Sequence, residues 1–475
     1  MATIALAPVQ YEVDGIEDAI EFYYQKGWTD GLPVVPPTEE KVRRFLEAAK
    51  REPDEVIGTY ETRRRVVTVE KLAINSVMAG CLPEYFPVVL AIFEAILAPG
   101  FNLHVPNSTT GGAALGFIVT GPIRNELGMN YRGNVLGPGN RANSTIGRAV
   151  RLSQINVMGS LPGAGAEDPL GRPVFDRATL GQPGKYTGYH IVENEEDYPS
   201  LLPVHVEQGF NRDQSAVTVF ATGGHVQISA HAEDSAQKIA DTVARHLVGS
   251  GKLVARGGFC IIVIPPENLG YLIRDGWSKA DFRQAVFEGT KRQSEWLKSQ
   301  GWPVRATMDD GQDTMAITGS PDDIYVVAAG GPAGGFIHYL LPYGGPVTTR
   351  EIKIENIHNG PKPALEIGEN GRRKEREMVV AERLQVLDPT SEAVVEAGFK
   401  ATRLDTLDGK VLGLFNNQKL NAAQLLEMVG EVLGQQFQLK EIVRGTYSSS
   451  QHHKWEEWEK KDAARCDVVI LTHGD

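Results

Sequence analysis

Three cysteines, Cys81, Cys260 and Cys466, are the residues of this chain best suited to nucleophilic or redox chemistry. They lie far apart in the sequence, which argues against a disulfide framework and for a reducing, cytoplasmic setting. Cys81 stands just before the start of an expected helix, and a helix N-terminus stabilises a thiolate. We therefore treat Cys81 as a candidate reactive or resolving thiol. The alternative is a buried cysteine that behaves as a small hydrophobic side chain.

A glycine-containing loop at residues 137–143 leads into an expected helix that carries several arginines. Free backbone N–H groups at the start of a helix, next to guanidinium groups, bind carboxylate or phosphate readily. Arg151 follows on the same helix and adds to the positive charge. The alternative is a capped turn with surface arginines. The candidate substrate- or anion-binding residues are Arg141, Asn143, Ser144, Arg148 and His104.

Histidines and glutamates supply the remaining candidates for acid–base chemistry. His104, His205 and His231 could act as acids, bases or metal ligands, and Glu193 lies near His205 in the sequence. The chain has no H-E-x-x-H or C-x-x-C spacing, so we predict no metal site. A second glycine-rich stretch, residues 330–335, follows an expected strand but is not G-x-G-x-x-G. We expect close backbone packing there rather than a bound nucleotide.

The elements that must position these residues indicate an α/β protein of several domains. We expect a mainly helical region at 1–110, an α+β substrate-binding region at 111–365 and a polar linker at 366–400. Strands are predicted at 114–120, 259–264 and 324–329, and helices at 144–156, 235–248 and 278–298. Paired glycines at 223–224, between strands 217–222 and 225–229, predict a β-hairpin.

Residues 401–475 alternate strands and helices, which predicts a parallel sheet with right-handed crossovers, part of a doubly wound, flavodoxin-like fold. The expected strands are 410–415, 439–443 and 467–472. Asn421 should cap a helix whose apolar face carries Leu425, Met428, Val429 and Val432, and 453–465 should form a second helix. The last strand, VVIL at 468–471, is continuously aliphatic, as strands buried on both faces are.

Long ordered segments across the chain carry a resemblance to a known family. They are WTDGLPVVPPT (28–38), INSVMAGCLPEY (74–85), RANSTIGRAVR (141–151), GQPGKY (181–186), ENEE (193–196), HVEQGF (205–210), AGGPAG (329–334) and LDTLDGK (404–410). The chain resembles the UGSC family of (seleno)proteins, named for a selenocysteine or cysteine followed by Gly-Ser-Cys in a C-terminal α/β domain. The resemblance favours Cys81, His205 and Glu193 as catalytic residues.

The same resemblance implies what should follow the last strand. In the family this strand continues directly into the motif, so His473, Gly474 and Asp475 should form the loop that precedes the reactive residue. We expect the chain to be truncated here, with an opal codon for selenocysteine read as a stop. Cys466 lies at the opposite end of the strand and is interpreted as structural.

Three functions remain open. The first is a thiol- or selenol-dependent oxidoreductase or reductive-cleavage enzyme that acts on a small, anionic substrate, with an external thiol or protein electron donor and no bound cofactor. The second is a hydrolase or lyase that uses Asn143 and Arg148, with His205 as base. The third is a non-catalytic subunit completed by a second chain. A net charge of -12 argues against nucleic acid as a partner, and no membrane span is expected; a homo-oligomer or a thiol reductant remains open as partner.

Overall fold

The computed structural model describes residues 8–163, 165–168, 170–250, 258–299, 314–332, 334–343, 345–353, 383–391, 404–416, 422–446 and 461–472. The chain divides into two compact units, Met1–Val394 and Val395–Asp475. The division falls inside the segment predicted as a linker. Both units mix helices and strands, as the sequence predicts.

The N-terminal unit is built on a seven-stranded mixed sheet. Its strand order is β10-β7-β11-β6-β4-β5, and β12 also pairs with β6. The β10–β7 and β4–β5 pairs are parallel, and the pairs of β6 with its neighbours are antiparallel. The strands are β4 (Ala114–Thr120), β5 (Tyr189–Val192), β6 (Ala216–Ser229), β7 (Cys260–Ile264), β10 (Ile324–Ala328), β11 (Phe336–Pro342) and β12 (Thr348–Glu351).

Strand β6 corrects the predicted hairpin at Gly223 and Gly224. The chain does not turn back there but continues as one strand of 14 residues. Its first half pairs with β4, and its second half pairs with β11, whose register shifts between Leu341 and Pro342. Gly224 has φ of 128°, a value that favours glycine. The two glycines therefore allow β6 to change partners rather than to reverse direction.

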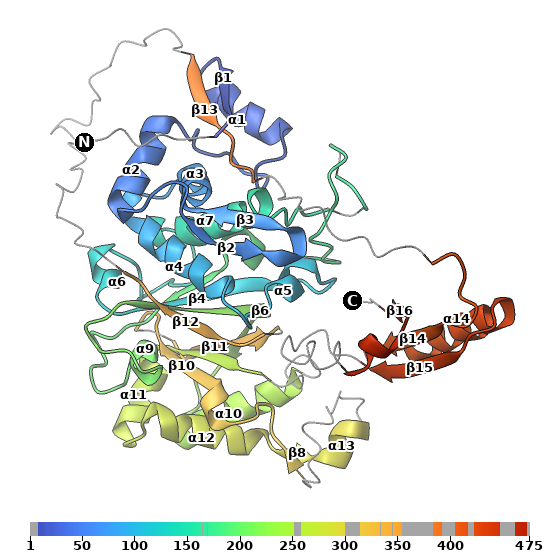
Figure 1. Cartoon of the computed structure of the whole chain (residues 1–475). Coiled ribbons are helices and arrows are strands. Elements are labelled where there is room, and N and C mark those ends of the chain that lie inside the picture. The colour runs from blue at the N-terminus through green and yellow to red at the C-terminus, as the bar shows by residue number, and fades with distance from the viewer. Residues whose placement is uncertain are drawn as a thin grey trace. The chain divides into compact units, whose positions relative to one another are not determined.

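The sheet curls, so that its two edges meet at the carboxyl ends of β5 and β10. The backbone N–H of Asn194 donates to the carbonyl of Ala328, 2.7 Å away. One face of the sheet encloses a small apolar core that includes Ile118, Phe220 and Val327. Two separate groups of helices cover the opposite, outer face. Because the sheet is curled, this outer face points in two directions, and the two groups lie on two sides of the sheet in Figure 1.

The first group of helices holds most of the candidate residues. Helix α4 is apolar except for Glu94 and is almost completely buried, and α7 packs against both α3 and α4. Helix α7 begins where Asn140 caps it, with the N–H of Asn143 donating to the Asn140 side chain. The helices are α1 (Ile16–Gln25), α2 (Glu39–Ala49), α3 (Val69–Ala79), α4 (Phe86–Ile96), α5 (His104–Ser108), α6 (Ile123–Glu126), α7 (Arg141–Asn156) and α8 (Gly184–Thr187). Helix α9 (Val204–Glu207) is separate from this group, and its Val204 belongs to the core that the sheet encloses.

The second group covers the β7–β10 end of the sheet with α10 (Ala236–Gly249), α11 (Pro266–Arg274) and α12 (Lys279–Thr290). The single helix predicted at 278–298 is instead two helices, because the chain leaves the helix at residues 291–293. After α12, the residues Arg292–Gln293 form β8, which pairs with β9 (Thr314–Met315), and α13 (Ser294–Ser299) follows.

Two further strand pairs lie in the N-terminal unit. Strand β2 (Val56–Tyr60) pairs with β3 (Arg65–Thr68), and β1 (Gln10–Val13) pairs with β13 (Leu384–Leu387). Strand β13 falls within the predicted linker, yet its Leu387 carbonyl accepts a hydrogen bond from the Tyr23 hydroxyl. The mainly helical start of the chain therefore also contains strands.

The C-terminal unit contains a three-stranded parallel sheet in the order β15-β14-β16, as the alternation in the sequence predicts. Its strands are β14 (Val411–Asn416), β15 (Glu441–Thr446) and β16 (Val468–Leu471), and α14 (Ala422–Gln436) connects the first two. Strand β16 lies at an edge and is only half-buried, unlike the fully buried strand that its aliphatic sequence predicts. The helix predicted at 453–465 lies largely outside the described residues.

Helix α14 turns a different face to the sheet than predicted. Leu426 and Gly430 face β14, whereas Leu425, Met428 and Val432 are exposed. A Cβ atom at Gly430 would lie 2.8 Å from a methyl group of Leu414. Glycine thus allows the helix to approach β14 closely on this face. The face with Leu426 and Gly430 therefore packs on the sheet, and the face with Leu425, Met428 and Val432 does not.

Candidate functional site

Three of the segments that carry the family resemblance meet at helix α7. The guanidinium group of Arg148 donates from Nε and Nη2 to the two carboxylate oxygens of Asp30, each at 2.8 Å. Arg148 Nη2 also donates to the carbonyl of Pro33 at 2.9 Å. The Asp30 side chain is only 4% exposed. This bidentate pair fixes the loop at 30–33 to α7 and leaves Arg148 without free charge for a substrate anion.

Arg141 lies at the first turn of α7 and is exposed. Its Nε donates to the carbonyl of Gly80 at 2.9 Å, which ties the turn before Cys81 to α7. The rest of its guanidinium group faces solvent. Arg141 is therefore the member of the predicted anion-binding set that is best placed to meet a ligand at this surface.

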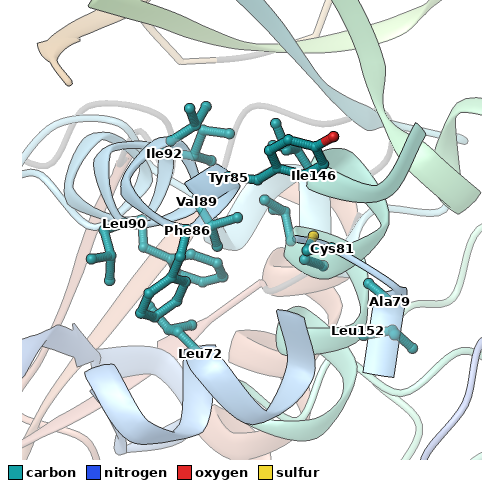
Figure 2. Packing of buried hydrophobic residues seen from close by; sticks show 14 of the residues in the cluster. Leu72, Ala79, Cys81, Tyr85, Phe86, Val89, Leu90, Ile92, Ile146 and Leu152 are labelled. Carbon is teal, nitrogen blue, oxygen red and sulfur yellow. The ribbon is translucent and has the colours of Figure 1, made fainter. Parts of the chain in front are cut away.

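Cys81 is buried among apolar side chains between α3, α4 and α7 (Figure 2). Burial raises the pKa of its thiol to about 12, although the Thr145 side chain and the charges of Arg141 and Arg148 act in the opposite direction. The predicted activation by a helix N-terminus is outweighed, because desolvation disfavours the thiolate. The residues that follow form a short 3-10 turn, Pro83–Tyr85, before α4 begins. In this structure Cys81 is a protonated, enclosed thiol.

Asn143 and Ser144 lie in the first turn of α7. The Asn143 side chain accepts from the backbone N–H of Asn130 at 3.1 Å and donates to the carbonyl of Asn130 at 2.8 Å. Both polar atoms are used in fixing the neighbouring loop, so Asn143 has a structural role here. The geometry thus gives no support to the expected pocket formed by Asn143 and Arg148. Ser144 is half-buried on the same turn.

Glu193 and His205 lie together, and apart from α7, at the carboxyl end of β5. The Glu193 carboxylate accepts from Lys279 Nζ at 2.6 Å and from the backbone N–H of Val204 at 2.7 Å. Glu193 and Lys279 are each only 2% exposed. Glu193 therefore caps helix α9 and joins it to α12.

His205 lies on α9 and is completely buried. Burial lowers the pKa of its imidazole, while the charge of Glu193 acts in the opposite direction. Backbone groups of Asn211 and Arg212 lie near the ring, yet neither ring nitrogen has a partner with hydrogen-bond geometry among the described residues. The structure brings the two predicted catalytic residues together but encloses them.

His104 is separate from both groups. It lies at the start of α5, where its Nε2 is 3.4 Å from the Ser108 hydroxyl and its ring packs at 5.7 Å from the ring of Phe175. These contacts hold α5 against the segment around 175. His104 therefore does not share a site with Arg141 in this structure.

A small pocket opens on the other face of α7, and the sequence analysis missed most of the residues that form it. Its volume is about 20 Å³, and Asn107, Arg151, Gln154 and Lys185 supply its polar lining. Asp176 accepts from Arg151 Nη2 at 2.8 Å and from Lys185 Nζ at 2.5 Å. Arg151 was noted only as an addition to the arginines of α7. The signal for Lys185 was present, because it lies in the GQPGKY segment.

The described residues contain no group of three or more His, Cys, Asp or Glu that could hold a metal ion. Within those same residues, no helix has the length and apolar character needed to cross a bilayer. The predicted loop residues His473, Gly474 and Asp475 lie outside the described part of the chain.

The architecture defines a two-unit protein with a curled mixed sheet and a small parallel α/β unit. Residues 385–475 match the model of the UGSC family, which confirms the resemblance for this segment. The matched segment contains the whole described part of the β15-β14-β16 sheet. A comparison with curated proteins gives no match.

Proposed function

We propose that the protein is a thiol- or selenol-dependent oxidoreductase or reductive-cleavage enzyme. Its reactive chalcogen would be a selenocysteine or cysteine encoded directly after Asp475. The observation that carries the proposal is the family match, which covers a strand, β16, that ends beside β14. The pairing with β14 continues one residue past the end of β16, because the N–H of Thr472 donates to the carbonyl of Phe415 at 3.1 Å.

The strand order supports this position for the reactive group. Helix α14 leads from β14 to β15 on one side of β14, whereas β16 returns to its other side. The carboxyl ends of β14 and β16 thus flank the point at which the strand order reverses. Ligands and reactive groups of open α/β sheets lie at such switch points. This supports the carboxyl end of β16 as the place of the proposed reactive group.

None of the three cysteines of the chain has the properties of a reactive thiol. Burial raises the pKa of both Cys81 and Cys260 to about 12. Cys466 has a raised pKa and precedes β16, so it lies at the opposite end of that strand. A reactive thiol needs both a depressed pKa and an accessible sulfur atom. None of the three has a depressed pKa, and Cys466 alone among them is partly exposed. We therefore propose that the redox chemistry belongs to the chalcogen of the motif that the family resemblance implies, where a selenol would be ionised and would be a good leaving group.

The gene provides the first test. We expect an in-frame TGA codon after codon 475, followed by codons for Gly-Ser-Cys. An ochre or amber terminator at that position, with no separate gene for the rest of the unit, would refute the proposal. A separate gene that encodes the remainder would favour the subunit completed by a second chain.

The second test compares three purified proteins in the reduction of a small-molecule disulfide by a dithiol. The first ends at Asp475, the second continues through the motif with cysteine at the proposed reactive position, and the third has serine at that position. We expect activity only from the second protein, and its loss after alkylation with iodoacetamide. Equal activity of the first or third protein would contradict the proposal, because those proteins lack the proposed nucleophile.

A further inference from the structure

The pocket beside α7 contains more positive than negative charge. Arg151 and Lys185 both line it, with side chains 10% and 13% exposed, and both pair with the single carboxylate of Asp176. As far as the described residues define the pocket, its lining contains no Asp or Glu. One buried positive charge is thus left without a counter-ion of its own. Enclosing such a charge is costly, so the pocket favours an anion.

A neutral donor points to the same kind of ligand. The Asn107 side chain accepts from Gln154 Nε2 at 2.9 Å, and its own Nδ2 group has no partner with hydrogen-bond geometry. Asn107 lines the pocket and is 3% exposed. The Tyr60 hydroxyl lies near this amide without satisfying it. A buried, unsatisfied N–H group carries a desolvation cost that an acceptor oxygen in the pocket would remove.

The size of the pocket limits the ligand. A volume of about 20 Å³ holds one or two groups of the size of water. We propose that this pocket binds the carboxylate group of a small molecule, with Arg151 and Lys185 as charged partners. A carboxylate has two acceptor oxygens in one plane, which a guanidinium group can meet with two parallel hydrogen bonds.

The titration behaviour of Lys185 is consistent with this assignment. Burial lowers the pKa of its ammonium group, Arg151 lowers it further, and Asp176 acts in the opposite direction. A bound carboxylate would favour the charged form of Lys185. Binding should therefore take up a proton at high pH, and the affinity for the anion should fall as the pH rises through the range in which Lys185 loses its proton.

The inference names a substrate class for the proposed enzyme, but binding is measured without turnover. The proposed redox function could therefore fail while this inference stands, and the reverse also holds. The experiment uses the full 475-residue chain and records saturation transfer to the methyl protons of acetate and of acetamide. Acetamide has almost the same shape and no charge, so it serves as the matched ligand control.

We expect saturation transfer to acetate and at least tenfold less to acetamide. Lys185→Met should abolish the acetate signal, since it removes the surplus charge but leaves the Arg151–Asp176 pair intact. Lys185→Arg should retain the signal. Arg172→Gln serves as a control, because it breaks an Arg–Asp pair with Asp168 that lies outside the pocket lining.

Three results would overturn the inference. They are equal signals from acetate and acetamide, an acetate signal that persists in Lys185→Met, and displacement of acetate by chloride or phosphate at equal concentration. If Lys185→Met does not fold, the comparison of acetate with acetamide on the unaltered chain decides the question.

Discussion

Two faces of helix α7 carry arginine–aspartate pairs that look alike at short range but differ in their charge balance. On the Cys81 face, Arg148 meets the carboxylate of Asp30 with two hydrogen bonds of 2.8 Å. On the pocket face, Arg151 meets Asp176 at the same distance, but Lys185 shares that carboxylate. Distance alone does not separate the two pairs; the number of cations per carboxylate does.

This difference separates a structural pair from a ligand-binding one. A matched bidentate pair uses its charge to hold the loop at 30–33 against α7. On the other face, Arg151 and Lys185 share one carboxylate, so one positive charge has no counter-ion of its own. Both side chains line the small pocket. The buried Glu193–Lys279 pair belongs with the first kind, since one carboxylate meets one ammonium group and a helix N–H.

The largest effect is expected from Asp176→Asn, which leaves Arg151 and Lys185 side by side without a carboxylate. Removing one partner of a buried ion pair costs about 3–5 kcal/mol of unfolding free energy. Adding Lys185→Met to this variant should recover part of the loss, because one buried cation is removed. Chemical denaturation of the single and double variants measures both changes. A double variant no more stable than Asp176→Asn would show that charge balance does not control this face.

His190 tests whether the interior beneath α7 is closed to charge. This strand β5 residue is buried, and burial lowers the pKa of its imidazole from 6.5 to about 4. The unfolded chain therefore binds a proton at a higher pH than the folded one. The contribution of His190 to the free energy of unfolding is therefore fully present above pH 6.5. It is lost as the pH falls from 6.5 to 4, and the loss is about 3 kcal/mol.

The measurement compares the free energy of unfolding at several pH values between 7 and 4 in three proteins. His190→Leu should reduce the loss of stability on acidification, whereas His246→Gln, at an exposed position on α10, should not. Identical pH profiles for His190→Leu and the unaltered chain would mean that His190 can be protonated in the folded protein.

A smaller effect is expected when the matched pair is broken. Asp30→Asn leaves Arg148 at a position where its side chain is 15% exposed, so solvent screens part of the unpaired charge. We expect a loss of about 2 kcal/mol, less than for Asp176→Asn. The same denaturation experiment measures it. A loss equal to or greater than that of Asp176→Asn would reverse the proposed order of the two faces.

The sequence predicted the regular elements better than their connections. Strand β4 lies where expected, at Ala114–Thr120, because its apolar run is bounded by glycines. The hairpin at Gly223 and Gly224 was wrong, since paired glycines permit a bend within a strand as well as a turn. Only the neighbours of β6, which are distant in sequence, decide between the two.

The candidate site was predicted in part for a similar reason. Residue type identified Arg148 and Glu193 as charged groups in matching segments, but their counter-ions, Asp30 and Lys279, lie 118 and 86 residues away. A counter-ion that arrives through tertiary contacts turns a candidate ligand residue into a structural one. The same long-range pairing leaves Lys185 and Arg151 with one carboxylate between them, which no local pattern reveals.

Cys81 gives the smallest expected effect and separates the reactive from the structural interpretation of the Cys81 face. As an enclosed thiol with a pKa of about 12, it should react with iodoacetamide at pH 8 no faster than global or local unfolding exposes it. Cys81→Ala should cost about 1 kcal/mol of stability through lost packing.

The reaction is followed by mass spectrometry of the folded chain, with Cys466, which is half-buried, as the internal reference. We expect Cys466 to be modified first and Cys81 only after denaturant is added. Rapid modification of Cys81 in the folded chain would show that the Cys81 face opens to solvent. That result would return Cys81 to the list of reactive thiols and would weaken the assignment of the redox chemistry to the C-terminal unit alone.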